Sequence, residues 1–169
     1  MPDPAAADAP PLVVVMGVSA SGKTTVGEKL ARRCGVEYAD ADAFHPKANI
    51  AKMSSGVPLT DEDRWPWLRA IGEWLAARAG TGGVVSCSAL RRSYRDVLVD
   101  NAPTVRFLHL DGDPSVIRER IARRKDHFMP PSLIDSQLET LEPLEADEPG
   151  RAIDLTKSPD AIVEAFLAS

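Results

Sequence analysis

One short stretch constrains the fold of this chain more than any other feature, and it reads Gly17-Val18-Ser19-Ala20-Ser21-Gly22-Lys23-Thr24. It fits the phosphate-loop pattern G-x-x-x-x-G-K-[ST] at every fixed position. The apolar, β-branched run Leu12–Met16 precedes it and predicts a buried parallel strand. Apolar residues at helical spacing follow it, namely Val26, Leu30 and Cys34. Strand, loop and helix in this order predict an α/β domain that binds a nucleotide phosphate.

The residue types of the phosphate loop suit that ligand. Gly17 and Gly22 let the backbone bend so that its N–H groups point at phosphate oxygens, and the helix start adds partial positive charge. Lys23 would place its charge between the β- and γ-phosphates, while the Thr24 hydroxyl would reach Mg²⁺. We therefore predict that ATP binds here and that Lys23 is catalytic. The predicted ATP-binding residues of the loop are Gly17, Val18, Ser19, Ala20, Ser21, Gly22, Lys23, Thr24 and Thr25.

Composition limits the class of partner. The chain has 169 residues and a formal net charge of −5, which argues against a nucleic acid or an anionic membrane. Two cysteines, Cys34 and Cys87, form no disulfide framework and fit a reducing cytosol. No apolar run reaches the length of a membrane span. We expect residues 1–11, rich in Ala, Pro and Asp, to be a disordered tail, and residues 12–169 to form one domain.

Two carboxylates follow the second predicted strand, Val36–Ala39. Asp40 and Asp42 stand two apart at the carboxyl end of this strand, where open α/β sheets bind ligands. One of them can hold Mg²⁺ through water while the other faces an acceptor hydroxyl. An Asp-rich turn that caps a helix explains the same spacing equally well.

The segment from Phe44 to Asp61 is rich in Pro, Gly, His and Lys, and it is too irregular for a core helix. Long irregular segments in compact domains are often binding loops. A helix is predicted to begin at Asp61-Glu62-Asp63, and Trp65 and Trp74 within it are expected to serve packing rather than function. Arg64 lies at the helix start, where a cation is disfavoured unless it binds something, which makes it a ligand candidate beside the default of a surface arginine.

Three further strands complete a predicted five-stranded sheet. Residues 82–88 form the third and lead into a polar turn, 104–110 form the fourth and 151–155 the fifth. Phosphate-loop enzymes often carry an acidic residue after the third strand to hold the metal. This chain has none there, which favours Asp40 and Asp42 in that role. Helices are predicted at 91–99, from Asp113-Pro114 onward, and up to Leu167.

The helix after the fourth strand carries a basic cluster and stops at Pro130-Pro131, after which a helical pattern resumes over Ser132–Leu141. Two helices around a short Arg-rich segment indicate a closing lid at about residues 120–140, which would exclude water from phosphoryl transfer. Arg120 and Arg124 share one helix face and are the lid arginines expected to contact ATP, with Arg124 catalytic. A solvated basic face accounts for at least some of this cluster.

Several motifs together resemble the bacterial-type gluconokinases, over about residues 12–168. The middle of the chain contains Asp40-x-Asp42-x-Phe44-His45-Pro46, Asn49-Ile50-x-Lys52-Met53, Gly56-x-Pro58-Leu59-x-Asp61 and Asp63-Arg64-x-Pro66-Trp67-Leu68. The third-strand motif is Ser86-Cys87-Ser88-Ala89-Leu90-Arg91-Arg92-x-Tyr94-Arg95-Asp96. The lid motif is His127-Phe128-Met129-Pro130-x-Ser132-Leu133, followed by Ser136-Gln137 and Thr140-Leu141-Glu142.

The resemblance implies a nucleoside-monophosphate-kinase-like phosphate-loop fold and ATP-dependent phosphorylation of D-gluconate at its 6-hydroxyl. It also implies Mg²⁺ held by Thr24 and Asp40, a cytoplasmic setting and a homodimer. Asp42 would accept the proton of the attacking hydroxyl or simply orient it. The residues that we expect around gluconate are Asp42, His45, Lys52, Arg64, Ser88, Arg91 and His127.

The chain departs from the family pattern at two residues. Ala20 and Ala41 each replace a glycine that is usual there. We expect little effect from Ala20, which occupies a free position of the general phosphate-loop pattern. Ala41 requires only that the backbone at this residue not need a positive φ.

Two alternative functions remain open from sequence. A shikimate or nucleotide kinase would share the phosphate loop, the Asp-x-Asp region and the lid, although the stretch from His45 to Lys52 speaks against both. A nucleotide-binding regulatory module that has lost catalysis is a minor alternative, because Lys23, Thr24, Asp40 and Asp42 are all intact.

Overall fold

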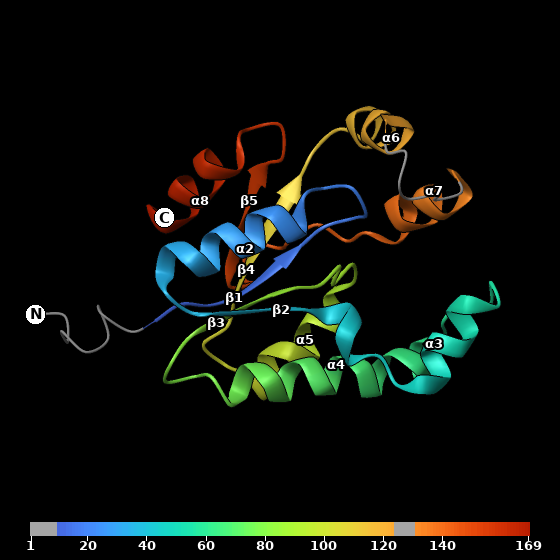
Figure 1. Ribbon diagram of the computed structural model, residues 1–169, viewed down its shortest axis with the longest axis horizontal. Coiled ribbons are helices and arrows are strands. Elements are labelled where there is room, and N and C mark those ends of the chain that lie inside the picture. The colour runs from blue at the N-terminus through green and yellow to red at the C-terminus, as the bar shows by residue number, and fades with distance from the viewer. Residues whose placement is uncertain (1–9, 124–130) are drawn as a thin grey trace, which may run out of the picture.

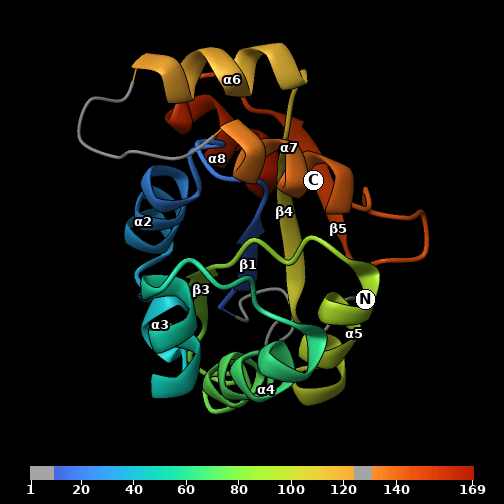
Figure 2. The same cartoon turned by 90° about the vertical axis from the view of Figure 1, so that its right-hand side faces the viewer.

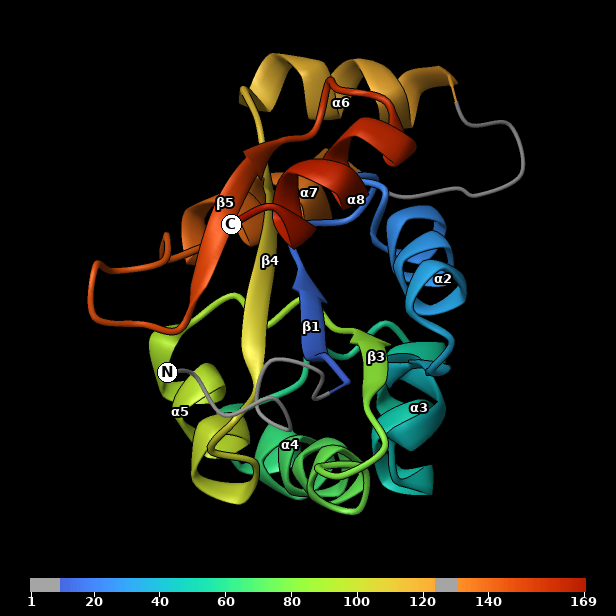
Figure 3. The ribbon, with the colours of Figure 1, turned by 90° about the vertical axis from the view of Figure 1, so that its left-hand side faces the viewer.

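The computed structural model describes residues 10–123 and 131–169, and it confirms the predicted parallel α/β architecture. A five-stranded, all-parallel sheet has the strand order β2-β3-β1-β4-β5 (Figures 1 and 3). Because every connection between parallel strands must cross over the sheet, helices cover both of its faces. The strands are β1 (Leu12–Met16), β2 (Glu37–Asp40), β3 (Gly83–Ser86), β4 (Arg106–Asp111) and β5 (Gly150–Asp154).

Strand β1 forms the centre of the molecule. Its side chains alternate between two apolar clusters, since successive residues of a strand point to opposite faces. Val13 and Val15 join the cluster beneath α2 (Lys23–Cys34) and α8 (Pro159–Leu167). Val14 and Met16 join the cluster beneath α4 (Asp61–Ala76) and α5 (Arg92–Asn101). Burial on both faces favours apolar side chains at every position of β1, which explains its uninterrupted apolar sequence.

Local signals in the sequence set the ends of the helices. Gly35 ends α2 in the left-handed conformation, with φ of 68°. Thr60 and Asp63 form a capping box at the start of α4, each side chain accepting a hydrogen bond from the other residue's backbone N–H. Ser158 caps α8 by accepting from the N–H of Ala161. The remaining helices are η1 (Ala41–Phe44), α3 (Lys47–Ser54), α6 (Pro114–Arg123) and α7 (Pro131–Thr140).

The segment between β2 and α4 differs from its predicted form. The expectation of an irregular binding loop is wrong over Lys47–Ser54, which forms the helix α3, and over the short 3-10 helix η1. Helix α3 is not part of the core, because Asn49 is its only buried residue and Ile50 and Met53 are about half exposed. A helix this exposed lacks the apolar periodicity by which sequence analysis recognises helices.

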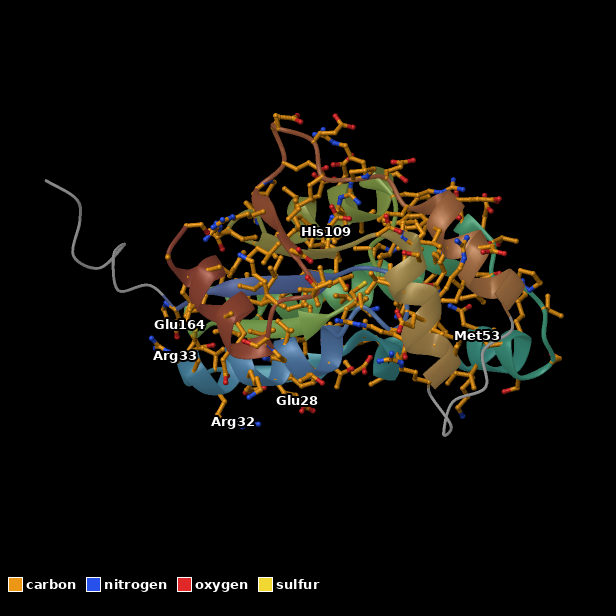
Figure 4. All side chains as sticks on the ribbon, turned by 90° about the horizontal axis from the view of Figure 1, so that it is seen from above. Glu28, Arg32, Arg33, Met53, His109 and Glu164 are labelled. Carbon is orange, nitrogen blue, oxygen red and sulfur yellow. The ribbon has the colours of Figure 1, made fainter. Side chains whose placement is uncertain are left out.

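Helices α2 and α8 lie side by side on one face of the sheet. Figure 4 shows Arg33 of α2 next to Glu164 of α8, and the Nε of Arg33 donates to Oε1 of Glu164 over 3.2 Å. Lys29 and Asp160 form a second exposed pair, also at 3.2 Å. Such surface pairs add little stability, so the apolar cluster beneath them holds the helices together. Within the described residues, no helix combines the length and hydrophobicity that crossing a bilayer would require.

His109 is a buried polar residue in the middle of β4. The residue is 1% exposed, lies in the interior of the molecule (Figure 4), and neither ring nitrogen has a hydrogen-bond partner among residues 10–123 and 131–169. Burial lowers the pKa of this imidazole, and the charge of Arg95 lowers it further, while Asp111 acts in the opposite direction. The folded protein therefore holds His109 in its neutral form.

We expect the stability of the protein to fall in mild acid because of His109. The unfolded chain, with an ordinary histidine pKa of 6.5, takes up the proton before the folded chain does. The contribution of neutral His109 to the free energy of unfolding is therefore complete above about pH 6.5. It is lost as the pH falls below that value, at up to about 1.4 kcal/mol per pH unit. Urea unfolding of the natural protein and of His109→Leu, at about pH 7.5 and about pH 5.5, measures it. Equal acid destabilisation of both proteins would contradict this assignment.

Candidate active site

The carboxyl ends of β1, β2 and β3 meet at one edge of the sheet, and a cavity of about 320 Å³ opens there. This is where parallel α/β sheets bind ligands. Figure 2 looks onto this edge and shows α7 in front of it. The cavity is lined by Ser19, Ala20, Gly22, Lys23, Thr24, Thr25, Asp40, Ala41, Asp42, Trp67, Ser86, Cys87, Ser88, Ile121 and Gln137.

The phosphate loop between β1 and α2 forms one wall of the cavity. Gly17 and Gly22 have positive φ values of 149° and 99°, which side chains rarely adopt. The N–H of Gly17 donates to the Ser88 carbonyl over 3.3 Å, which ties the loop to the end of β3. The Lys23 ammonium donates to the carbonyls of Gly17 and Val18, at 3.0 Å each. These contacts fix the loop to the end of β3 and hold the Lys23 ammonium at the cavity wall.

Ala20 was expected to have little effect, but the structure shows that its backbone conformation is strained. Its φ is 66°, so an L-residue with a Cβ occupies the left-handed region. The left-handed conformation costs an L-residue about 1–2 kcal/mol of conformational free energy, and glycine avoids this cost because it has no Cβ. Arg120 of α6 supports the strained turn, because its Nη1 lies 3.4 Å from the Ala20 carbonyl and 3.3 Å from that of Ser21. Ala41, in contrast, has no positive φ, as expected.

Asp40 and Asp42 form the opposite wall. Asp40 ends β2 beside Ser86 of β3, and its Oδ1 accepts a hydrogen bond from the backbone N–H of Asp42 over 2.9 Å. The capping turn that the sequence offered as one alternative is present, and both of its carboxylates line the cavity. Partial desolvation raises the pKa of Asp42, and the neighbouring charge of Asp40 raises it further, although the side chain is exposed within the cavity. Asp42 is therefore a stronger base than an ordinary aspartate.

The donors around Thr24 and Asp40 fit Mg²⁺. A hydroxyl and a carboxylate are hard oxygen ligands, and Mg²⁺ is usually held by one or two carboxylates together with phosphate oxygens and water. Among the residues described, no cluster of three or more His, Cys, Asp and Glu side chains could bind a metal by itself. Such a site suits a metal that arrives with its nucleotide.

His45 and Trp67 extend the wall beyond Asp42. Their rings stack 4.4 Å apart with an interplanar angle of 9°, and the Trp67 Nε1 donates to the Ala41 carbonyl over 2.7 Å. Burial lowers the pKa of His45, with Arg64 adding to this effect and Asp42 opposing it. Trp67 both packs in the core and lines the cavity.

Two arginines share one aromatic platform and one carboxylate. The guanidinium carbons of Arg64 and Arg91 lie 5.5 Å and 6.0 Å from the centre of the Tyr94 ring. Asp61 faces both, with an oxygen 3.4 Å from Arg64 and another 3.9 Å from Arg91. The Tyr94 hydroxyl donates to Asp61 over 2.6 Å and is the largest influence that lowers the pKa of this carboxyl. These two cations are gathered at one place and share a single counter-ion.

Lys52 is engaged elsewhere. Its ammonium lies 2.6 Å from Oδ2 of Asp63, and this bond together with the capping contacts from Thr60 lowers the pKa of Asp63 to about 2. The sequence placed Lys52 beside Arg64 and Arg91 as an equal candidate for substrate binding. In the structure it links α3 to the capped start of α4.

A buried ion pair fixes the turn after β3. Arg95 is fully buried, its Nε lies 2.7 Å from Oε1 of Glu148, and its Nη1 donates to the Ala89 carbonyl over 2.9 Å. Ala89 has a positive φ of 44°, so the turn that carries Ser88 is strained. The buried pair holds this turn in place, and Ser88 lines the cavity as predicted.

The structure places part of the predicted site around the cavity, and the predicted residues in its lining are Ser19, Ala20, Gly22, Lys23, Thr24, Thr25, Asp40, Asp42 and Ser88. Four predicted substrate-binding residues lie outside this lining, namely His45, Lys52, Arg64 and Arg91. Arg124 and His127 lie outside the described residues, so their assigned roles stay predictions. Sequence reasoning assigned no role to the cavity positions of Ile121 and Gln137. Gln137 did belong to the Ser136-Gln137 motif, which was the one available signal.

A sheet of this order, with a phosphate loop after its central strand and an Asp-x-Asp turn across the cavity, defines a phosphate-loop kinase. A family model described as an AAA domain matches residues 12–144. The crystal structure of a shikimate kinase from Aquifex aeolicus has a TM-score of 0.57 at 16% identity, covering 92% of this chain and 93% of that one. That likeness shows the fold alone.

Two relatives are much more similar. The gluconokinase of Gluconobacter oxydans is 47% identical over 160 residues, which cover 94% of this chain and 90% of the relative. The crystal structure of a gluconokinase from Sinorhizobium meliloti has a TM-score of 0.85 and 52% identity, covering 94% of this chain and 90% of that one. The chain belongs to the gluconokinase family.

We expect Asp42→Asn to reduce turnover at least about tenfold while ATP binding is retained, because an amide cannot accept a proton as the carboxylate does. Acceptor-dependent ADP release measures turnover, and calorimetric titration with ATP measures binding. Asp100→Asn, at an exposed residue of α5, is the matched control. Turnover equal to that of the natural protein would remove Asp42 from the chemistry.

Proposed function

We propose that this chain transfers the γ-phosphoryl group of ATP to the 6-hydroxyl of D-gluconate, giving 6-phospho-D-gluconate and ADP. One observation carries the proposal. The phosphate loop and Asp42 face each other across a single cavity, in a chain of the gluconokinase family. A phosphate donor on one wall and a base on the other are the two groups that transfer to an alcohol requires.

The phosphate loop supplies the positive field for the nucleotide. The N–H groups of the loop and the start of α2 would bind phosphate oxygens, and Lys23 would exchange its contacts with loop carbonyls for the transferring phosphate. Arg120 lies against the same loop and would add a second cation. Thr24 and Asp40 would hold Mg²⁺, which neutralises charge on the phosphates when bound.

Asp42 would receive or orient the acceptor hydroxyl. Its raised pKa favours proton acceptance as the oxygen forms its bond to phosphorus. Because the transition state of phosphoryl transfer is loose, positioning of the hydroxyl contributes alongside basicity. Ser88 lines the cavity, His45 stacks on Trp67 of α4, and both would offer polar partners for the other hydroxyls of a polyol.

Arg64 and Arg91 are the best-placed cations for the carboxylate of gluconate. They lie together on Tyr94, and they share Asp61, so an arriving carboxylate would meet two guanidinium groups at one place. Lys52 is less suited, because its ammonium is already 2.6 Å from Asp63.

Family membership is also the support for two further inferences, a cytoplasmic setting and a homodimer.

The decisive experiment is ADP release with Mg-ATP and one acceptor at a time. We expect strong stimulation by D-gluconate and little by shikimate or AMP. Stimulation by shikimate instead would favour the related kinase chemistry, and ATP binding without any acceptor-dependent release would favour a binding module that has lost catalysis.

We expect Arg64→Ala and Arg91→Ala each to raise KM for gluconate at least about tenfold, since each removes a charge-assisted hydrogen bond to the carboxylate. KM for ATP should stay unchanged, because neither residue lines the phosphate loop. Lys52→Ala should change the thermal midpoint more than KM for gluconate, since it removes the contact with Asp63. Arg69→Ala, an exposed arginine of α4, is the control. A larger KM effect for Lys52→Ala than for either arginine would reverse the assignment.

A further inference from the structure

A polar side chain of helix α7 bonds to the phosphate loop. The backbone N–H of Ser19 donates to Oε1 of Gln137 over 2.7 Å, across 118 residues of sequence. Both residues line the cavity, and the Gln137 side chain is partly buried. A backbone N–H can only donate, so the carboxamide must present its oxygen here, and the orientation of the side chain follows.

The Gln137 oxygen accepts from a kind of donor that phosphate loops offer to nucleotides. The N–H groups of a phosphate loop bind anionic oxygens of the nucleotide, and Ser19 belongs to that loop. One N–H has one proton to donate, so a phosphate oxygen and Gln137 Oε1 cannot both accept it at full strength. The carboxamide and the phosphate are therefore competitors for the same donor.

We propose that Gln137 is a displaceable internal ligand of the phosphate loop, which holds α7 to the loop until a nucleotide phosphate takes over the Ser19 N–H. Nucleotide binding then releases the helix at this contact and couples the occupancy of the loop to the position of α7. The inference rests on the nucleotide-binding half of the proposed function and requires nothing of gluconate.

The bond between Gln137 and Ser19 is one of several internal contacts of the loop, but it differs from the others in its expected effect on nucleotide binding. Lys23 bonds to the loop's own carbonyls, and Arg120 contacts Ala20 and Ser21, so both cations can turn toward a phosphate and gain from it. Gln137 offers an oxygen, which a phosphate repels and replaces. Its removal should therefore favour the nucleotide, whereas removal of either cation should weaken nucleotide binding.

Two substitutions at this residue have opposite expected effects. Gln137→Ala removes the competitor, and ADP and a non-hydrolysable ATP analogue should bind about two- to tenfold more tightly, the factor that one net hydrogen bond represents. Gln137→Glu places a charged acceptor on the same N–H, and the same ligands should bind at least about tenfold more weakly. Adenosine, which carries no phosphate, should bind all three proteins equally.

Calorimetric titration measures these affinities, with Glu139→Ala, an exposed residue on the same helix, as the control for truncation. Thermal midpoints establish that each variant is folded. Unchanged or weaker nucleotide binding by Gln137→Ala would overturn the proposal, as would an unchanged affinity in Gln137→Glu. Because no acceptor is present, failure here is distinguishable from failure of gluconate phosphorylation.

A second readout uses the composition of the chain. Gln137 is its single glutamine, so glutamine-selective ¹⁵N labelling of the side-chain amide gives one pair of NMR signals. These signals should shift on addition of ADP and remain in place on addition of adenosine. If the signals do not shift on addition of ADP, the carboxamide keeps its environment when nucleotide is bound to the loop, and the proposal fails.

Discussion

The cavity depends on the parallel pairing of β2, β3 and β1, because only strands that run in one direction bring their carboxyl ends to the same edge. The pairing of Asp40 with Ser86 places the Asp-x-Asp turn, and the hydrogen bond from Gly17 to the Ser88 carbonyl joins the phosphate loop to the end of β3. Burial of β1 on both faces fixes this arrangement, since a slip of one residue would turn its side chains to the wrong clusters.

Polar contacts hold the loops at this edge where apolar packing cannot. Arg95 and Glu148 are both buried and carry the turn of Ala89, and Arg120 supports the turn of Ala20. Both alanines have positive φ, so the loops on two sides of the cavity are strained and are held by a nearby guanidinium. Breaking a buried pair such as Arg95–Glu148 costs about 3–5 kcal/mol, far more than an exposed pair between α2 and α8.

Several polar groups in and near the cavity have internal partners before any ligand arrives. Lys23 contacts loop carbonyls, Ser19 donates to Gln137, and Asp61 faces Arg64 and Arg91. A group that has no partner in a low-dielectric cavity is costly, so internal partners lower the free energy of the empty site. A ligand must consequently replace these internal partners when it binds. The net free energy of binding is therefore smaller than the free energy of the contacts made with the ligand.

Sequence by itself determined the class of fold and the main walls of the site. The phosphate loop, the apolar β1 and the Asp-x-Asp turn are local patterns, and each is specified by residues close together in the chain. The helix caps at Gly35, Thr60 and Ser158 are local in the same sense, because residues next to the helix ends form them. Such features follow from backbone conformation and strand burial, which short stretches encode.

Only the tertiary structure decided how distant groups share partners. Lys52 pairs with Asp63 and not with the arginine pair, and Trp67 lines the cavity wall. Gln137 accepts a hydrogen bond from the N–H of Ser19. The tertiary structure also turned the expected loop over Lys47–Ser54 into the exposed helix α3. These outcomes depend on contacts between residues far apart in sequence and on a helix without apolar periodicity, for which no local pattern exists.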